Sequence, residues 1–292
     1  MIPPAGAHGG DGEAVARSLG LDPRSMLDLS ASLNPFAPPI APLLVRHADT
    51  VRRYPDGELA TRAMAAALGV DPDRVLLTNG GSEAIALVAR ALGGQVASEP
   101  EFALHPRAGT GPVWRSDPHN PTGVLASADQ RADVWDEAFY PLATGRWTAG
   151  RPGVVVGSLT KVFACPGLRL GYVLADDVDR FRADQPSWPV STLALAVLED
   201  LLAIAELDVW ARRIAAQREE LARVLAKHGL EAMPTDAPWL LVTAPGLRER
   251  LAPCGVLVRD CASFGLPGLA RIAVPDDDGL ARLTDALDRT AP

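Results

Sequence analysis

Lysine and asparagine are rare in this chain, and most of their copies stand in short polar motifs. Only Lys161 and Lys227 are lysine among 292 residues, so arginine supplies the rest of the 28 basic residues. Lys161 closes the run Ser-Leu-Thr-Lys, directly after the apolar stretch 154–156. A desolvated lysine amine can form a Schiff base with a carbonyl compound. The run also fits a lysine that merely ends a loop, or the SxxK motif of serine acyl-enzymes, for which Lys227 supplies no KTG partner.

The elements that must position such residues alternate between helical and strand-like patterns from about residue 58. Helices are expected over 58–68 and 82–92. A proline-rich extended segment, 34–42, is expected to connect an N-terminal arm to this body. Short apolar strands are expected at three places: 74–78, 154–156 and 172–174. This alternation predicts an α/β body with a largely parallel sheet, in a large domain over 40–190.

After residue 189 the pattern changes. Two long helices are followed by short strands and a last helix, and the expected helices are 191–206, 209–227 and 279–288. The pattern is typical of a smaller α+β domain. We expect this domain to consist of 191–292 together with the N-terminal arm, 1–39.

Composition excludes several classes of function. The net charge of −8 argues against nucleic acid or an anionic membrane as the main partner. No apolar stretch approaches the roughly 20 residues that span a bilayer, and the first residues do not resemble a secretory signal. The three cysteines are far apart and lack CxxC spacing, which argues against a disulfide framework and against a thiolate zinc site. We therefore expect a reduced, cytoplasmic enzyme without a metal.

Taken together, the motifs resemble a known family. Ser-Leu-Thr-Lys161 is followed by Pro-Gly-Leu-Arg169-Leu-Gly-Tyr, and upstream stand Asp136-Glu-Ala-Phe139 and His-Asn120-Pro-Thr-Gly. In this order they are similar to fold-type I pyridoxal-phosphate enzymes of the class I/II aminotransferase superfamily. Within it, the chain most resembles the L-threonine-O-3-phosphate decarboxylases of cobalamin biosynthesis, which are relatives of histidinol-phosphate aminotransferases. Phe139, where many aminotransferases have tyrosine, favours the decarboxylase-like group.

The resemblance implies a role for each cofactor-binding residue. Lys161 would carry the cofactor and move a proton at the substrate Cα, Asp136 would face the pyridine nitrogen, and Asn120 would bind the phenolic oxygen. Phe102 would stack on the ring with His105 behind it, although a core aromatic and a surface histidine remain the alternative. The phosphate would lie at a helix N-terminus, where free N–H groups favour an anion. The expected phosphate ligands are Gly81, Ser82, Ser158 and Arg169.

The resemblance also implies substrate and subunit contacts. Arg271 would hold the α-carboxylate, with an exposed strand residue as the alternative, while His8 and Arg259 would hold a distal phosphate. Asn34 would line the substrate side. Tyr54 matches a tyrosine that reaches the phosphate of the neighbouring subunit, which implies a homodimer.

Three functions stay open at this point. The first is decarboxylation of a phosphorylated amino acid such as L-threonine O-3-phosphate. The second is transamination of the histidinol-phosphate type, and the third is a shortened, non-catalytic family member. The segment 102–161 is clearly shorter than in the family, which predicts missing parts of the sheet and of its covering helices.

Overall fold

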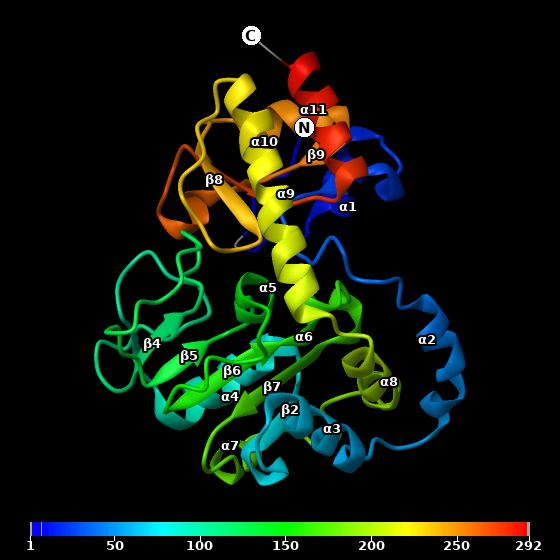
Figure 1. The fold of residues 1–292 in the computed structure, drawn as a ribbon, viewed down its shortest axis with the longest axis vertical. Helices are drawn as coiled ribbons and strands as arrows, with labels where there is room; N and C mark the ends of the chain where they lie inside the picture. Colours follow the sequence, from blue (N-terminus) through cyan, green and yellow to red (C-terminus); the bar gives the residue numbers. More distant parts are fainter. Residues whose placement is uncertain (1, 7, 291–292) are drawn as a thin grey trace.

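The computed structural model of this chain describes residues 2–6 and 8–290. Its larger sheet has six strands in the spatial order β2, β7, β6, β5, β4, β3 (Figure 1). The strands are β2 Val75–Asn79, β3 Gln95–Val96, β4 Val113–Ser116, β5 Val134–Asp136, β6 Val154–Ser158 and β7 Leu170–Leu174. Five of them share one direction, and β7 alone runs antiparallel to its neighbours. The expected mostly parallel α/β sheet is therefore confirmed, with one reversed strand that the sequence pattern did not indicate.

Helices cover both faces of the β2–β7–β6 half of this sheet. Successive strand residues alternate between the faces, so Val75 and Leu77 join one apolar cluster and Leu76 joins another. The first cluster includes α3 (Glu58–Leu68) and α8 (Thr192–Ala203), and the second includes α4 (Gly80–Leu92). Shorter helices flank them: α5 Tyr140–Thr144, α6 Leu159–Val162 and α7 Asp179–Arg182.

The β5–β4–β3 half is covered differently. Parallel neighbours are usually joined through an α-helix, yet the connections over 97–112 and 117–133 contain none. Both are irregular loops that lie at the edge of the sheet (Figure 1). The shortened segment that the sequence predicted thus corresponds to crossovers without helices.

A second group of elements lies on the other side of the molecule (Figure 1). A three-stranded antiparallel sheet has the order β10 (Arg259–Asp260), β11 (Leu269–Ala273), β8 (Trp239–Thr243). The N-terminal arm joins this group through β1 (Leu27–Asp28), which pairs in parallel with β9 (Val256–Leu257). The remaining helices are α1 Gly12–Leu19, α2 Ala41–Arg46, α9 Leu207–Lys227, α10 Leu247–Leu251 and α11 Asp277–Arg289.

The long helix α9 contributes to both apolar cores. Trp210, near its start, belongs to the core of the larger sheet, whereas Leu221 and Leu225 belong to the core of the smaller one. The helix α8 also packs on the larger sheet. We therefore propose two domains whose cores meet along α9, with the core of the large domain extending beyond residue 190.

Within residues 2–6 and 8–290, none of the helices is both long enough and apolar enough to cross a membrane.

Candidate active site

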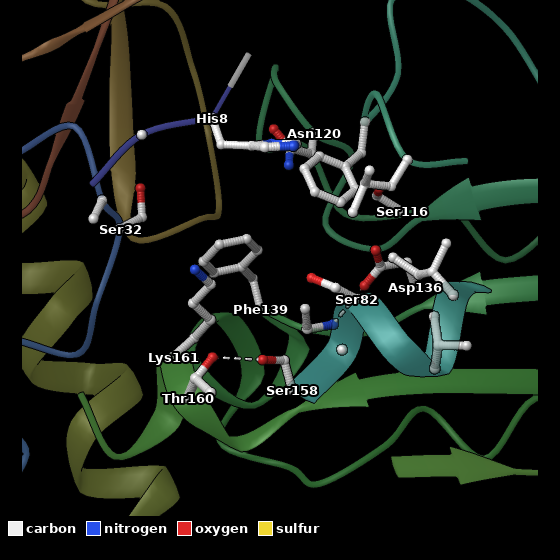
Figure 2. Close-up of a pocket in the computed structure, with 18 of the residues that line it drawn as sticks. His8, Ser32, Ser82, Ser116, Asn120, Asp136, Phe139, Ser158, Thr160 and Lys161 are labelled. Carbon is white, nitrogen blue, oxygen red and sulfur yellow. Dashed lines mark hydrogen bonds between the residues drawn. The ribbon is translucent and has the colours of Figure 1, made fainter. Parts of the chain in front are cut away.

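A cavity of about 310 Å³ lies where the larger sheet, the N-terminal arm and the C-terminal elements meet. Figure 2 shows Lys161, Ser158 and Ser82 on the side of the larger sheet and His8, from the N-terminal arm, on the opposite side. Eleven of the residues that the sequence singled out line this cavity: His8, Gly81, Ser82, Phe102, Asn120, Asp136, Ser158, Lys161, Arg169, Arg259 and Arg271.

Two other candidates lie elsewhere. Asn34 is buried behind the cavity wall, where its Nδ2 donates to the carbonyl of Val162 (2.9 Å) and its backbone N–H donates to that of Lys161 (3.0 Å). The resemblance had led us to expect Asn34 on the substrate side, but it is not among the residues that line this cavity, and its bonds hold the lysine segment. Tyr54 is 79% exposed and packs on Trp188, with ring centroids 4.7 Å apart. A role in a neighbouring subunit stays a prediction.

One end of the cavity is suited to an anion. The helix α4 begins with Gly80, at φ 76°, and a Cβ there would approach Nη2 of Arg169 to 2.5 Å. Glycine thus allows the guanidinium to lie against the first turn of the helix, where free backbone N–H groups are concentrated. Ser158 and Thr160 add two hydroxyls whose oxygens lie 2.7 Å apart. The arrangement offers the donors that a phosphate dianion requires.

Lys161 lies in the first turn after β6, and the pKa of its amine is lowered, which favours nucleophilic chemistry. Burial, and secondly the charges of Arg271 and Arg169, lower the pKa of Lys161 to about 8. The Nζ atom lies 5.8 Å from the ring centroid of Phe139. A larger share of this amine than of an ordinary lysine amine is therefore neutral near physiological pH, and the neutral form is the one that reacts with an aldehyde.

Asp136 ends β5 and is held by two donors. Its Oδ1 accepts from the backbone N–H of Ala138 (3.0 Å), and its Oδ2 lies 3.0 Å from Nε2 of His105. His105 is fully buried and packs edge-on against Phe102. It is neither a surface histidine nor merely behind the aromatic ring: it is a direct partner of the carboxylate.

The side of the cavity formed by the smaller sheet is cationic. Nη1 of Arg271 donates to Oδ1 of Asn120 (2.8 Å), and its guanidinium lies over the ring of Trp239. Arg259 donates to the hydroxyl of Ser263 (2.9 Å). Burial first, and then the charge of Arg259, lower the pKa values of both Arg271 and His8. Arg271 is 6% exposed, so it is not the exposed strand residue of the alternative reading.

The donor set fits pyridoxal phosphate. The phosphate cradle, the amine of Lys161, the aromatic ring of Phe102 and the carboxylate of Asp136 all line one cavity. Two buried polar atoms that face this region, Oγ of Ser32 and Nε of Arg271, have no hydrogen-bond partner among the described residues. Buried donors are normally satisfied, which indicates that the site is built around a polar ligand.

Sequence reasoning missed several residues of the region. Thr160 was inside the lysine motif, and its hydroxyl could have been identified from the spacing alone. Phe264 lines the cavity but stands in no recognisable motif. Glu101 lies behind the cavity, and nothing in its sequence surroundings indicated that its carboxylate is buried.

Comparison with known proteins places this site in a family. Residues 103–287 match the model of aminotransferase class I and II. The threonine-phosphate decarboxylase of Salmonella typhimurium is 30% identical, over 98% of this chain and 98% of that protein. The histidinol-phosphate aminotransferase 1 of Dechloromonas aromatica is 27% identical, over 94% and 92%. The first alignment extends over 361 positions, so the relative has residues that this chain of 292 lacks.

Solved structures share the fold. The histidinol-phosphate aminotransferase of Sinorhizobium meliloti, in complex with pyridoxal-5'-phosphate, has a TM-score of 0.81 at 18% identity, over 96% of this chain and 94% of that one. The L-threonine-O-3-phosphate decarboxylase of Porphyromonas gingivalis has a TM-score of 0.71 at 22% identity, over 99% of both chains. The family match, the relatives and the donor set lead to one conclusion: the chain belongs to the aminotransferase class I and II family and is a pyridoxal-phosphate-dependent enzyme.

Proposed function

We propose that the chain is a decarboxylase of cobalamin biosynthesis that acts on a phosphorylated amino acid such as L-threonine O-3-phosphate. One observation carries the proposal. Arg259 and Arg271 are direct partners in the register of β10 and β11, and both are buried beside the cavity. Like charges at directly opposite positions destabilise a sheet. A substrate with two anionic groups would offset this repulsion.

The two arginines have different surroundings, which supports assigning a different anionic group of the substrate to each. Arg271 bonds to Asn120 and lowers the pKa of Lys161, so it lies toward the reacting end of the cavity. Burial first, and then the charge of Arg259, lower the pKa of His8, whereas for Lys161 the charge of Arg259 is the last of the causes and follows that of Arg271. We assign the α-carboxylate to Arg271. The distal phosphate is assigned to Arg259 and His8, because a guanidinium and an imidazole together suit a dianion.

Pyridoxal phosphate, when bound, supplies an electron sink for the charge that develops at the substrate Cα. In the proposal, Gly81, Ser82, Ser158 and Arg169 hold its phosphate. The contacts to its ring are Asp136 at the ring nitrogen, Asn120 at the phenolic oxygen and Phe102 on the ring face. Lys161 holds or moves the proton at the substrate Cα, for which a pKa near the working pH is favourable.

A histidinol-phosphate type aminotransferase is the second candidate. It is favoured by relatives of that name with similar identity to this chain. Both reactions need the same cofactor residues, and both substrates carry a phosphate. Product analysis with L-threonine O-3-phosphate separates them, because decarboxylation releases carbon dioxide and transamination yields a keto acid.

The experiment on the proposed phosphate site compares two ligands. Binding of L-threonine O-3-phosphate and of L-threonine would be followed through the cofactor absorbance in Arg259→Ala and Arg271→Ala. Loss of a charge-assisted contact costs about 1.5–3 kcal/mol, or roughly ten- to a hundredfold in affinity. Arg259→Ala should weaken only the phosphorylated ligand, and Arg271→Ala should weaken both. The exposed Arg250 provides the control, as Arg250→Ala should change neither.

An equal effect of Arg259→Ala on the two ligands would contradict the phosphate assignment. A general aminotransferase would then be the better account.

We further propose that the enzyme is a homodimer in which Tyr54 reaches the neighbouring site. Its ring partner Trp188 is exposed in the single chain, and so are three apolar residues that precede or follow it closely in the sequence: Val45, Val51 and Leu59. Sedimentation should give a dimer, and Tyr54→Ala should weaken cofactor binding without changing the fold. A monomer with full cofactor affinity would refute this arrangement.

A further inference from the structure

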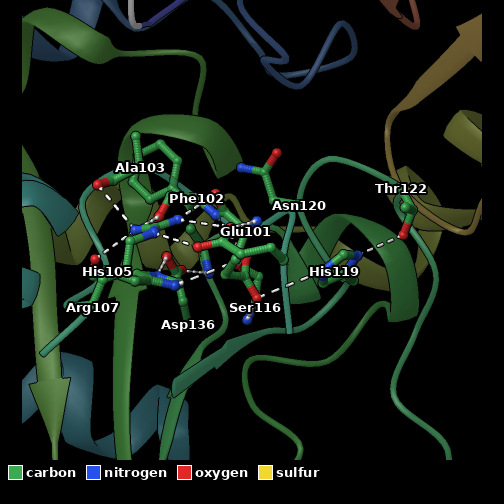
Figure 3. Close-up of polar contacts among 12 residues, drawn as sticks. Glu101, Phe102, Ala103, His105, Arg107, Ser116, His119, Asn120, Thr122 and Asp136 are labelled. Atoms are coloured by element: carbon green, nitrogen blue, oxygen red, sulfur yellow. Dashed lines mark hydrogen bonds and ion pairs between the residues drawn. The ribbon is translucent and has the colours of Figure 1, made fainter. Parts of the chain in front are cut away.

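Glu101 is a buried carboxylate that the proposed function does not use. Its side chain is 1% exposed, and it does not line the cavity. Figure 3 shows it in the loop after β3, between His105 on one side and His119 on the other. Burial of an ionised carboxylate is costly unless the charge is paired and hydrogen-bonded. The surroundings of Glu101 therefore indicate what the charge does.

Three donors fix the orientation of this carboxylate. Its Oε1 accepts from the hydroxyl of Ser116 (2.6 Å) and from the backbone N–H of Phe102 (2.9 Å), and its Oε2 accepts from the backbone N–H of Ser116 (3.0 Å). Within the described part of the chain, the ion pairs of Glu101 involve histidines and no lysine or arginine. The carboxylate is held rigidly, and its charge is directed at two imidazoles.

Each oxygen faces one ring nitrogen that has no hydrogen-bond partner among the described residues. Nδ1 of His105 lies 3.9 Å from Oε1, and Nε2 of His119 lies 3.8 Å from Oε2. A bare nitrogen lone pair would face a negative oxygen at ion-pair distance, whereas an N–H would be attracted to it. The geometry favours a proton on these nitrogens.

The two histidines differ in their other contacts. Nδ1 of His119 lies 2.7 Å from the hydroxyl of Thr122, and burial lowers the pKa of His119 more than Glu101 raises it. The opposite ring nitrogen of His105, Nε2, lies 3.0 Å from Oδ2 of Asp136, and an ionised carboxylate only accepts. His105 thus stands between two carboxylates, and it is the imidazole of the two whose ring nitrogens both face a carboxylate.

We propose that Glu101 is a positioning residue that keeps a proton on Nδ1 of His105, so that His105 faces Asp136 as a cationic donor. A cationic donor stabilises the ionised form of Asp136. Asp136 then remains an acceptor toward the cavity, where the proposed function places the pyridine nitrogen of the cofactor. Glu101 acts on the cofactor only through His105, and the inference rests on that proposed role of Asp136.

Other charged groups near His105 leave this arrangement in place. Glu99 and Arg107 neutralise each other in an ion pair at the surface (2.6 Å), and Nη1 of Arg107 donates to the backbone carbonyl of His105 (2.7 Å). His119 approaches from the loop after β4, and Asp136 approaches from β5. Glu101 and Asp136 are therefore the anions that face the His105 ring itself.

The test reads the protons of the His105 ring directly. The holoenzyme would be labelled with ¹⁵N-histidine, which gives five residues to distinguish, and His105 would be assigned from the signal that His105→Gln removes. At pH 7 both ring nitrogens of His105 should be protonated in the wild type. Glu101→Gln should lose the Nδ1 proton and keep the Nε2 proton, because Asp136 still accepts from Nε2.

Three variants distinguish the effect of the negative charge of Glu101 from the effect of a disturbed local structure. Glu101→Asp retains the charge and should retain the Nδ1 proton. Ser116→Ala removes a donor to Glu101 without removing its charge, and should also retain it. Glu99→Gln removes the same charge two residues away and should leave the ring unchanged. Persistence of the Nδ1 proton in Glu101→Gln, or its loss in Ser116→Ala, would overturn the inference.

A second readout connects the ring to the cofactor. The dissociation constant of pyridoxal phosphate should rise about tenfold in Glu101→Gln and return close to the wild-type value in Glu101→Asp. An unchanged constant in Glu101→Gln would contradict the role toward the cofactor. The proposed role of Asp136 is tested separately: if Asp136→Ala binds the cofactor normally, that role fails, whatever the His105 signals show.

Discussion

In the β2–β7–β6 half of the larger sheet helices bury apolar side chains on both faces, whereas in the β5–β4–β3 half, whose strands also bury Trp114 and Val134, the loops bury carboxyl groups as well. The first half packs residues such as Val88 and Leu170 at 0% exposure. The second half buries the carboxylates of Asp117 and Glu137 at 0% side-chain exposure, with Arg151 as their shared cation. The guanidinium of Arg151 also lies 4.2 Å from the ring centroid of Trp135.

The difference shows how a shortened chain retains a working cavity. Without crossover helices, the loops of the second half pack some apolar residues on the core, and the contacts of Arg151 with Asp117 and Glu137 add polar links between them. Apolar packing tolerates small truncations, whereas a buried charge that loses its partner is strongly destabilising. The two halves also contribute different chemistry. The amine and the phosphate cradle come from the first half, and the carboxylate that faces the cavity comes from the second.

The largest effect is expected in the helical half. Lys161→Ala should abolish the borohydride-reducible absorbance of the holoenzyme and lower turnover by at least roughly 10²–10⁴-fold, because no other amine lines the cavity in the described part of the chain. Lys227→Ala is the matched control, since it removes the only other lysine and should leave both properties intact. An adduct trapped at Lys227 in Lys161→Ala would show that the lysine was wrongly assigned.

The next effect tests the charge pairs of the loop half. Arg151→Ala leaves Asp117 and Glu137 without their cation and should lower the free energy of unfolding by about 3 kcal/mol. Ile85→Val on α4, in the helical half, should cost only about 0.5–1.5 kcal/mol. Urea unfolding followed by circular dichroism measures both.

The control for Arg151 is the exposed Arg131, whose side chain bonds only to backbone carbonyls in the described structure. Arg131→Ala should stay within about 0.5 kcal/mol of the wild type. If Arg151→Ala is no more destabilising than Arg131→Ala, charge pairs do not hold the loop half.

The last effect, no larger than that of Arg151→Ala, concerns pH. Burial raises the pKa of Glu137 to about 7 from an ordinary value of 4.5, although its hydrogen bonds and Arg151 oppose the shift. Because the folded-state pKa is raised, the stabilising contribution is complete below pH 4.5 and is lost as pH rises through 7. Relative to Glu137→Gln, the wild type should therefore lose up to about 3 kcal/mol of unfolding free energy across this window.

Unfolding free energies of the two proteins, measured at pH 4.5, 6 and 8, check this expectation. A difference that is constant with pH would mean that Glu137 does not titrate in this range.

The same two halves differ in how far the sequence predicted them. Helix 58–68 was predicted with its observed bounds, because the stretch is rich in alanine; in the structure it ends at Gly69, a left-handed C-cap. The cavity-lining residues of the lysine and arginine motifs were also identified from sequence. The pairing of His105 with Asp136 and the burial of Glu101 were not, because irregular loops have no period from which burial can be read. Asn34 was misplaced for a related reason: its motif fixes its neighbourhood but not the direction of its side chain.

The helix α9 has a consequence for the melting of the whole molecule. It runs without a break for 21 residues, and its two ends are embedded in different hydrophobic clusters. When one cluster melts, the turns of α9 packed in it lose the contacts that keep them helical. Because the backbone hydrogen bonds of α9 continue into the other cluster, unfolding of one end of the helix would spread to the turns packed in that cluster. Calorimetry should therefore record one cooperative heat-absorption peak, with a van't Hoff enthalpy close to the calorimetric one, where two separately linked globules would give two.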